Sequence, residues 1–432
     1  MKKKRIKLCL LSLSILLCGC AERMPDNEKP TEKTESQNKL ETRDFKTVFT
    51  EASEQAEEIK KITEKNMKFN DDFYLNIPEA DGVKKVVSFV MKTDEFWDFE
   101  KTYQTFEERL QQFFPDVYTE EEKKKNCIVL THSTVEKDDE SGGLLAYRES
   151  YEKSKNAILE GKRRLDCIFL EDDKGALEVY PGKFFQMSRE VAAKEDNDDA
   201  KLMYYPYLNH PIEKWIPITY QYKGEEAYPL MDKEISVKDA SKYVEKTLED
   251  IYEDDYALKP AVSSVRVVNM EKGFFDYTFS VTAQYEGIRF DCDPMKYAEY
   301  SSQANTGADG EDYDEHPATI QMIKSNEIDS MLGYGENYNF TEKEQYDKII
   351  DLKNAVKIFK NNVSEKMQLE ISNIDFAYSV YSKDEDETIQ YGTPEWKISA
   401  KNKKDNLDYF FYVNAIDGKF HYYYNQSSAD KN

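Results

Sequence analysis

The chain has 432 residues, of which 85 are Asp or Glu and 60 are Lys or Arg, and its formal net charge at pH 7 is −25. So acidic a surface repels a phosphate backbone, which excludes nucleic acid as an expected partner. The length allows two or three domains. Aromatic residues make up 13%, while only 16 Gly and 13 Pro are present, a balance that favours a globular α+β protein with substantial sheet.

Residues 1–19 have the pattern of an export signal. A positive N-terminus precedes an uncharged, Leu-rich stretch over 8–17, which is far shorter than the ~20 residues of a membrane-spanning helix. The stretch ends in Leu17-Cys18-Gly19-Cys20, which resembles the lipobox of bacterial lipoproteins. The resemblance implies a lipid on Cys20 and a mature protein anchored to the outer face of the cell membrane. The alternative is an ordinary secretory signal that ends by chance in a cysteine.

Residues 20–44 are almost entirely polar and cannot bury enough apolar surface to fold, so we expect a disordered tether between Cys20 and the folded part. Apolar residues then recur at helical spacing from Phe45 to Ile62, which predicts an amphipathic helix over 45–66 at the start of the folded chain.

An N-terminal α+β domain is expected over 45–230. After the first helix, the apolar pattern predicts a strand over 83–90, a helix from Thr93 to Phe113 that Pro115 stops, strands over 127–131 and 165–171, a hairpin over 172–180 and a strand-like aromatic stretch over 204–222.

Three cysteines follow Cys20, namely Cys127, Cys167 and Cys292. Cys127 and Cys167 occupy similar apolar runs, so two interpretations stay open. They could form a disulfide between neighbouring strands of an exported protein, or all three could be buried thiols.

The pattern of the C-terminal half predicts an internal duplication. Ser236 and Asp351, 115 residues apart, each occupy the cap position before an amphipathic helix. The apolar residues of the two helices, from Val237 to Tyr252 and from Leu352 to Met367, match position for position. Strand patterns follow both helices. We therefore expect two helix-plus-sheet units, over 231–305 and 318–428, and several small antiparallel sheets each packed with a helix.

These units resemble the PepSY-type α+β module of exported proteins, chiefly through Tyr412-Val-Asn-Ala-Ile-Asp-Gly-Lys-Phe420, where Asp417-Gly418 is a hairpin signal. Tyr285-Glu-Gly-Ile-Arg-Phe290 resembles a hairpin of related units, although it lacks the closing Asp-Gly turn. The resemblance covers about 236–425. It implies inhibitory or regulatory binding in the cell envelope, and no cofactor or catalytic apparatus.

Signatures of catalysis and of metal binding are missing from the sequence. It contains no phosphate-binding Gly-rich motif, no Gly-x-Ser-x-Gly and no His-Glu-x-x-His, and its four histidines are His132, His210, His316 and His421. The acidic segment 309–315 offers oxygen ligands that could hold Ca²⁺, but its spacing does not fit an EF-hand, and a solvated loop is the simpler interpretation. We expect no enzyme, no metal and no cofactor.

Three aromatic clusters could stack against sugars, although strand alternation predicts that most of their rings fill the core: Tyr204–Tyr207, Tyr409–Tyr412 and Tyr422–Tyr424. The leading hypothesis is a non-catalytic lipoprotein that binds another envelope protein. The alternatives are a solute- or glycan-binding lipoprotein and a cell-envelope hydrolase. A deep pocket on which Trp97 or Trp215 converges would favour solute binding, whereas two superimposable C-terminal modules without a pocket would favour a protein partner.

Overall fold

A computed structural model describes the chain in segments: residues 41–61, 66–93, 99–137, 144–172, 174–181, 185–189, 211–252, 257–270, 273–291, 318–334, 338–382 and 389–425. Cys20, Trp97, Cys292, the cluster 204–207 and the acidic segment 309–315 lie outside them. No helix among the described residues is long and apolar enough to cross a membrane.

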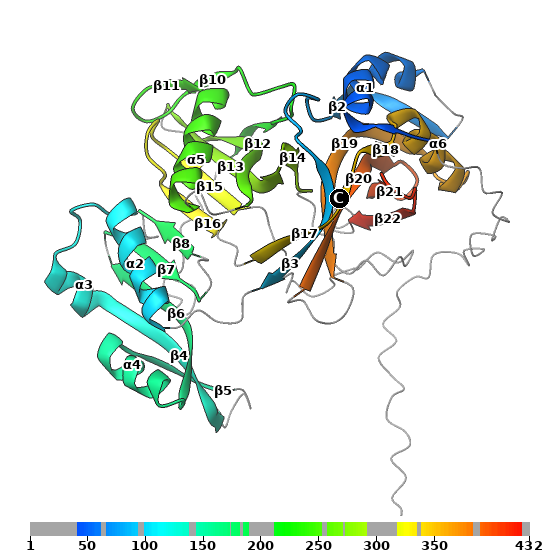
Figure 1. Cartoon of the computed structure of the whole chain (residues 1–432). Coiled ribbons are helices and arrows are strands. Elements are labelled where there is room, and N and C mark those ends of the chain that lie inside the picture. Colours follow the sequence, from blue (N-terminus) through cyan, green and yellow to red (C-terminus); the bar gives the residue numbers. More distant parts are fainter. Residues whose placement is uncertain are drawn as a thin grey trace, which may run out of the picture. The chain divides into compact units, whose positions relative to one another are not determined.

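The α+β class is confirmed, and three similar modules make up most of the described chain (Figure 1). In each module one helix precedes four strands that pair antiparallel in a meander. The first module has α2 (Phe99–Phe113) with β4 (Cys127–Lys137), β6 (Arg163–Asp172), β7 (Gly175–Val179) and β8 (Phe185–Ser188). The second has α5 (Val237–Tyr252) with β12 (Lys259–Asn269), β13 (Phe275–Tyr285), β15 (Ala318–Met322) and β16 (Ser330–Tyr334). The third has α6 (Leu352–Asn362) with β19 (Leu369–Ser382), β20 (Ile389–Asn402), β21 (Asp408–Asn414) and β22 (Phe420–Asn425).

The second and third modules have the predicted caps and apolar stripes. Ser236 Oγ accepts from the N–H of Asp239 at 3.1 Å, and Asp351 Oδ1 accepts from the N–H of Asn354 at 2.8 Å. Each cap satisfies an N–H that the first helical turn leaves without a backbone partner. The residues that face the sheet are fully buried in both helices: Val237, Ala240, Val244 and Leu248 in α5, and Leu352, Ala355, Val356 and Phe359 in α6.

Two boundaries differ from those expected. The helix predicted to reach Met367 ends at Asn362, because Val363 is already extended. Strands β15 and β16 lie within 318–428, the range expected to form the second unit, but they belong to the preceding module, because β15 pairs with β13 and β16 pairs with β15. Sequence spacing could not show this, since strand pairing is decided by tertiary contacts.

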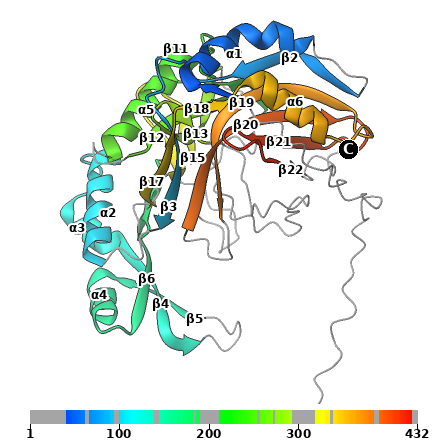
Figure 2. The same ribbon diagram turned by 45° about the vertical axis from the view of Figure 1, so that its right-hand side comes forward.

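The first module lies inside the expected N-terminal domain and contains an insertion. Between β4 and β6 the chain forms β5 (Leu144–Ser150), which pairs with β4, and α4 (Tyr151–Leu159); a short helix, α3 (Glu120–Asn126), precedes β4. Phe99 of α2 packs against Tyr151 of α4, with ring centroids 5.1 Å apart. Both helices therefore cover one face of the strands (Figure 2).

The last strands of the first two meanders, β8 and β16, pair antiparallel and join both modules into one sheet of eleven strands. Its far edge is β9 (Ile212–Pro217), which pairs with β12, and the short β14 (Ile288–Arg289) pairs with β13. Two short strands, β10 (Ala227–Pro229) and β11 (Glu234–Ser236), form a hairpin before α5. The first two modules share one hydrophobic core.

The beginning of the folded chain belongs to the third module. β2 (Met67–Asn76), β3 (Val86–Thr93) and β17 (Tyr338–Tyr346) complete its seven-stranded sheet, and α1 (Phe45–Lys60) packs beside α6. β2 runs parallel to β19, the one parallel pair among the described strands. The expected domain over 45–230 therefore contributes to two cores, because residues 45–91 pack with 349–415.

Residues 42–44, which were expected to end the tether, form the strand β1 (Thr42–Asp44). It pairs antiparallel with β18 (Lys348–Ile350), directly before α6. Asp44 then caps α1, since its Oδ1 accepts from the N–H of Thr47 at 3.0 Å. The predicted helix is confirmed, and it ends at Lys60.

Cys127 and Cys167 lie on the neighbouring strands β4 and β6, but both are free and buried. Cys127 is opposite Leu170, and Cys167 is opposite Leu130, so the two residues are offset along the strands and do not face each other. Of the two interpretations, the structure therefore has the buried thiols at these positions.

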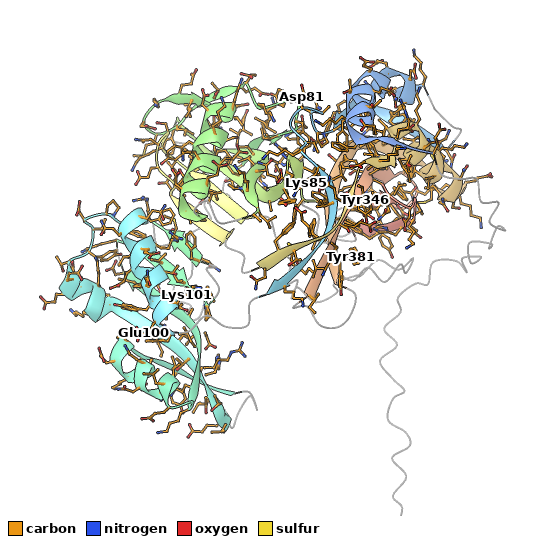
Figure 3. The ribbon with its side chains drawn as sticks, in the orientation of Figure 1. Asp81, Lys85, Glu100, Lys101, Tyr346 and Tyr381 are labelled. Carbon is orange, nitrogen blue, oxygen red and sulfur yellow. The ribbon has the colours of Figure 1, made fainter. Side chains whose placement is uncertain are left out.

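The second and third modules meet at the β13–β14 hairpin. Glu286 and Gly287 form its two-residue turn with φ of 48° and 89°, the left-handed pair that a tight hairpin requires. A Cβ atom at Gly287 would lie 2.2 Å from the carbonyl oxygen of Gly82, so only Gly fits. Lys85 stands directly before β3 (Figure 3). Its ammonium lies 5.4 Å from the centre of the Tyr285 ring. This close contact fixes the second module against β3.

Candidate binding groove

A groove of about 530 Å³ lies where the second and third modules meet. One wall comes from β9, the turn after it and β12 to β14. The other wall comes from β2 and from the face of β19, β20 and β21 that is turned away from the helices. Its lining combines aromatic, amide, hydroxyl and charged side chains, chiefly Asn70, Tyr74, Asn76, Trp215, Thr219, Ser264, Ser280, Arg289, Asp291, Glu370, Asn373, Asp375, Lys397, Ser399, Lys401, Asp408 and Phe410.

Strand β9 supplies the aromatic side chain at the rim. It begins after Pro211 and ends in Pro217, residues that limit strand pairing, and it is an edge of its sheet. Alternation places Ile216 in the core beneath α5, with 1% of its surface exposed, and turns Trp215 to the opposite face. Trp215 is 54% exposed. A large aromatic side chain held this openly beside a groove is suited to contact a ligand.

Strand β20 supplies the polar wall by the same alternation. Trp396, Ile398 and Ala400 point into the core shared with α1 and α6. Glu395, Lys397, Ser399 and Lys401 therefore point to the other face, and the last three line the groove. The single strand thus separates core from groove.

A buried ion pair forms the floor. Lys397 Nζ lies 2.6 Å from Asp291 Oδ1, and the side chains of both residues are less than 10% exposed. Tyr412 donates its hydroxyl to Asp291 Oδ2 at 2.7 Å, and the Lys397 ammonium lies 4.9 Å from the centre of the Phe410 ring. The charges compensate each other, so the floor is rigid and polar without a net charge.

Beside this pair lies a buried acid next to a histidine. Glu395 Oε2 is 3.6 Å from His421 Nε2, and the His421 ring stacks on Tyr412 with centroids 4.9 Å apart. Burial raises the pKa of Glu395 to about 8, and burial lowers the pKa of His421 to about 4. Both groups are therefore neutral at pH 7, and their proximity is not an ion pair there.

The β2 wall is irregular. Ile371 pairs with Phe69 and Asn373 pairs with Tyr74, so residues 70–73 bulge away from the single residue Ser372. The bulge brings Asn70 and Tyr74 to the groove. Next to it, Glu370 bridges Lys68 and Lys403, with both N–O distances 2.6 Å.

Metal-ligating groups, thiols and histidines elsewhere in the described part of the chain are arranged as follows. No group of three or more His, Cys, Asp or Glu among them could hold a metal ion. Burial raises the pKa of the thiols of Cys127 and Cys167 to about 12, so neither is a reactive thiolate at neutral pH. His132 of β4 contacts Asp166 of β6 in the first module, and neither residue lines the groove.

Of the residues singled out in the sequence, Trp215, Tyr409 and Phe410 lie at the groove. Tyr409 and Phe411 stack on the helix side of the sheet with Tyr422 and Tyr424, whereas Phe410 and Tyr412 face the other side with Tyr423, as strand alternation predicts. The sequence did not reveal the Lys397–Asp291 pair. These residues are 106 positions apart, and no local pattern marks either of them.

Comparison with known proteins does not assign the chain to a family. No family of known proteins matches the sequence, and no curated protein matches it. An uncharacterized protein from Eubacterium rectale is similar in structure, with 14% identity over 88% of this chain and 99% of that chain and a TM-score of 0.45. The C-terminal domain of YpeB from Bacillus megaterium has 11% identity over 77% of this chain and 100% of that domain, with a TM-score of 0.28. Neither similarity is close enough to define a function.

Proposed function

We propose that the protein is a non-catalytic lipoprotein of the cell envelope that binds an extended segment of another envelope protein in the groove. The observation that carries the proposal is that two sheet edges, β9 and β2, contribute to one groove. An edge strand offers backbone donors and acceptors to an incoming extended chain, while neighbouring side chains select its sequence.

Charge supports a basic partner segment. The chain carries a net charge of −25, and the ionic groups on the groove floor and on the β2 wall are already paired with each other. A basic segment would be steered toward such a protein, and an acidic one would be repelled.

The modules support the PepSY-type resemblance as part of this proposal. The expected helix and antiparallel meander occur in the second and third modules, and the first module has the same arrangement with an inserted strand and helix. Asp417-Gly418 closes the β21–β22 hairpin with Gly418 at φ 72°, as the motif implies. In this proposal the repeated modules serve regulatory binding.

The proposed anchor is a lipid on Cys20. It is inferred from the sequence pattern of residues 1–20. Two or more acyl chains hold a protein on a membrane stably, whereas one does so only marginally. Cell fractionation tests the anchor. Cys20→Ala is expected to leave the protein unprocessed or to release it, and a cleaved Cys20→Ala protein that stays in the membrane would refute the anchor.

Site-specific crosslinking on intact cells tests the groove. A photoreactive amino acid at position 215 is expected to capture one defined protein. The matched control is position 159 on α4, where Leu159 is 69% exposed but does not line the groove. The proposal fails if position 215 captures nothing, or if both positions capture the same set of proteins.

A glycan or small solute is the second candidate, because the groove contains an exposed Trp surrounded by amide and hydroxyl groups. Thermal unfolding in the presence of cell-wall glycan fragments distinguishes a glycan ligand from a protein partner. A saturable rise in melting temperature that Trp215→Ala abolishes, together with no captured protein, would establish the glycan and overturn the protein partner.

A further inference from the structure

The last strand of each meander lacks charged residues and Pro in all three modules. Strands β8 (Phe-Gln-Met-Ser), β16 (Ser-Met-Leu-Gly-Tyr) and β22 (Phe-His-Tyr-Tyr-Tyr-Asn) contain no Asp, Glu, Lys, Arg or Pro. Two of them pair with each other: Met331 lies opposite Met187, and Ser330 lies opposite Ser188. The molecule itself therefore shows what such a strand pairs with, namely the last strand of another module in antiparallel orientation.

Strand β22 pairs with β21, and in the described part of the chain no strand occupies its other edge. Natural proteins protect such edges with charges, Pro or bulges. The four other long edge strands carry charges or Pro, which prevent indiscriminate pairing and leave β2 and β9 open only to a segment of complementary sequence. These residues are Lys68, Asp71 and Asp72 in β2, Arg148 and Glu149 in β5, Glu213, Lys214 and Pro217 in β9, and Glu342, Lys343 and Glu344 in β17. Strand β22 has no such residue.

The outward edge of β22 is defined by its register. The N–H of Asn414 donates to the carbonyl of Lys419 at 2.8 Å, and hydrogen-bonded pairs alternate along an antiparallel ladder. Counting from that pair, the backbone groups of Phe420, Tyr422 and Tyr424 point away from β21.

Aromatic contacts hold the strand in this position. Tyr424 packs on Tyr409 with centroids 5.3 Å apart, and Tyr423 stacks on Phe410 at 5.0 Å. Because both faces of the strand are anchored, the edge is ordered before any partner arrives, which lowers the entropy lost on binding.

The charge of the third module permits self-association. Residues 351–425 include 10 Lys and 12 Asp or Glu, a net charge of −2, whereas the whole chain carries −25. Repulsion between two copies is therefore weakest if they approach through this module.

We propose that β22 pairs antiparallel with β22 of a second copy of the chain, so that two third modules share one continuous sheet about a two-fold axis. Within one chain, β8 and β16 already pair antiparallel. The proposed dimer would use the same kind of strand pairing between two chains. A contact of this size is small, so the dimer is weak in solution. Anchoring both copies to one membrane raises their effective concentration and favours it.

The mass of the detergent-solubilised full chain, measured by light scattering up to a concentration of about 100 μM, tests the dimer. The expected mass rises with concentration from one chain toward two. Tyr422→Pro removes an outward N–H and is expected to give one chain throughout, while Tyr422→Phe, which keeps the backbone, is expected to dimerise like the native chain.

Amide hydrogen exchange of the native chain provides a test that does not depend on the folding of a proline variant. Protection at Tyr422 and Tyr424 is expected to rise with protein concentration. A chain that stays monomeric at the highest concentration would overturn the proposal. So would a dimer in which these two amides exchange at the same rate at all concentrations, because another surface would then form it.

Discussion

In both the second and the third module, the second strand of the meander carries a buried acid directly before a buried aromatic residue. In β13, Asp276 precedes the buried Tyr277, and in β20, Glu395 precedes the buried Trp396; the two acids are 0% and 1% exposed. Burial raises the pKa of both acids. Their surroundings differ, since Asp276 accepts from Gln321 at 2.8 Å and Glu395 adjoins His421. The two modules thus share a buried carboxyl but give it different neighbours.

The residue two positions after the acid differs between the two strands. Thr278 of β13 corresponds to Lys397 of β20, which adds the charge that pairs with Asp291 on the groove floor. The third module thus contributes Lys397 to the ionic floor, whereas the second contributes Asp291 and the hydroxyl groups of Ser264 and Ser280. The same fold therefore forms two chemically different walls of one groove.

The largest effect is expected from the helix positions that correspond by the 115-residue shift, Phe359 of α6 and Val244 of α5. Both are almost fully buried, with 1% and 0% exposed. Phe359→Ala should destabilise the protein by about 3–5 kcal/mol, and Val244→Ala by about 1.5–3 kcal/mol, since less apolar surface is lost. Urea unfolding measures both. Equal losses would show that the modules do not pack their helices equivalently.

An intermediate effect concerns pH. The folded-state pKa of Glu395, about 8, lies above its ordinary value of 4.5, so folding binds a proton between these values. The stability that this proton provides is complete below about pH 4.5 and is lost as pH rises toward 8, by a few kcal/mol in order of magnitude. Glu395→Gln should flatten the melting temperature between pH 5 and 8.

Glu370→Gln is the control for this prediction. Hydrogen bonds from Lys403 and Lys68 lower the pKa of Glu370, so it is ionised in both folded and unfolded states above pH 5. Its replacement should leave the slope between pH 5 and 8 unchanged. The interpretation of Glu395 would be wrong if both variants kept the native slope.

The smallest effect is expected at the two helix caps. Ser236→Ala and Asp351→Ala each remove one side-chain hydrogen bond to the first turn, which should cost about 1 kcal/mol. Ser236→Asp and Asp351→Ser keep a capping oxygen and should recover most of the loss. Thermal unfolding measures the four variants, and a loss well above 2 kcal/mol at one site would reveal a further role for that side chain.

Local patterns predicted local structure well. The periodicity of α1, α5 and α6, the two caps, and the hairpins at Gly175 and Gly418 are all confirmed, because each depends on residues a few positions apart. The first module was not recognised as a copy, since the inserted β5 and α4 interrupt its meander. The return of residues 45–91 to the third module and the Lys397–Asp291 pair depend on contacts across more than a hundred residues, which no sequence window contains.

The three-residue pairing of β1 with β18 has a mechanical consequence. If Cys20 is fixed to a membrane, any pull on the body reaches the fold through Thr42, and 22 residues of chain permit a separation of at most about 75 Å. The load then falls on β1 and on the contacts of Arg43, which holds Glu51 of α1 and lies 3.8 Å from the Asp351 cap of α6. Tension at the anchor therefore enters the fold at the third module.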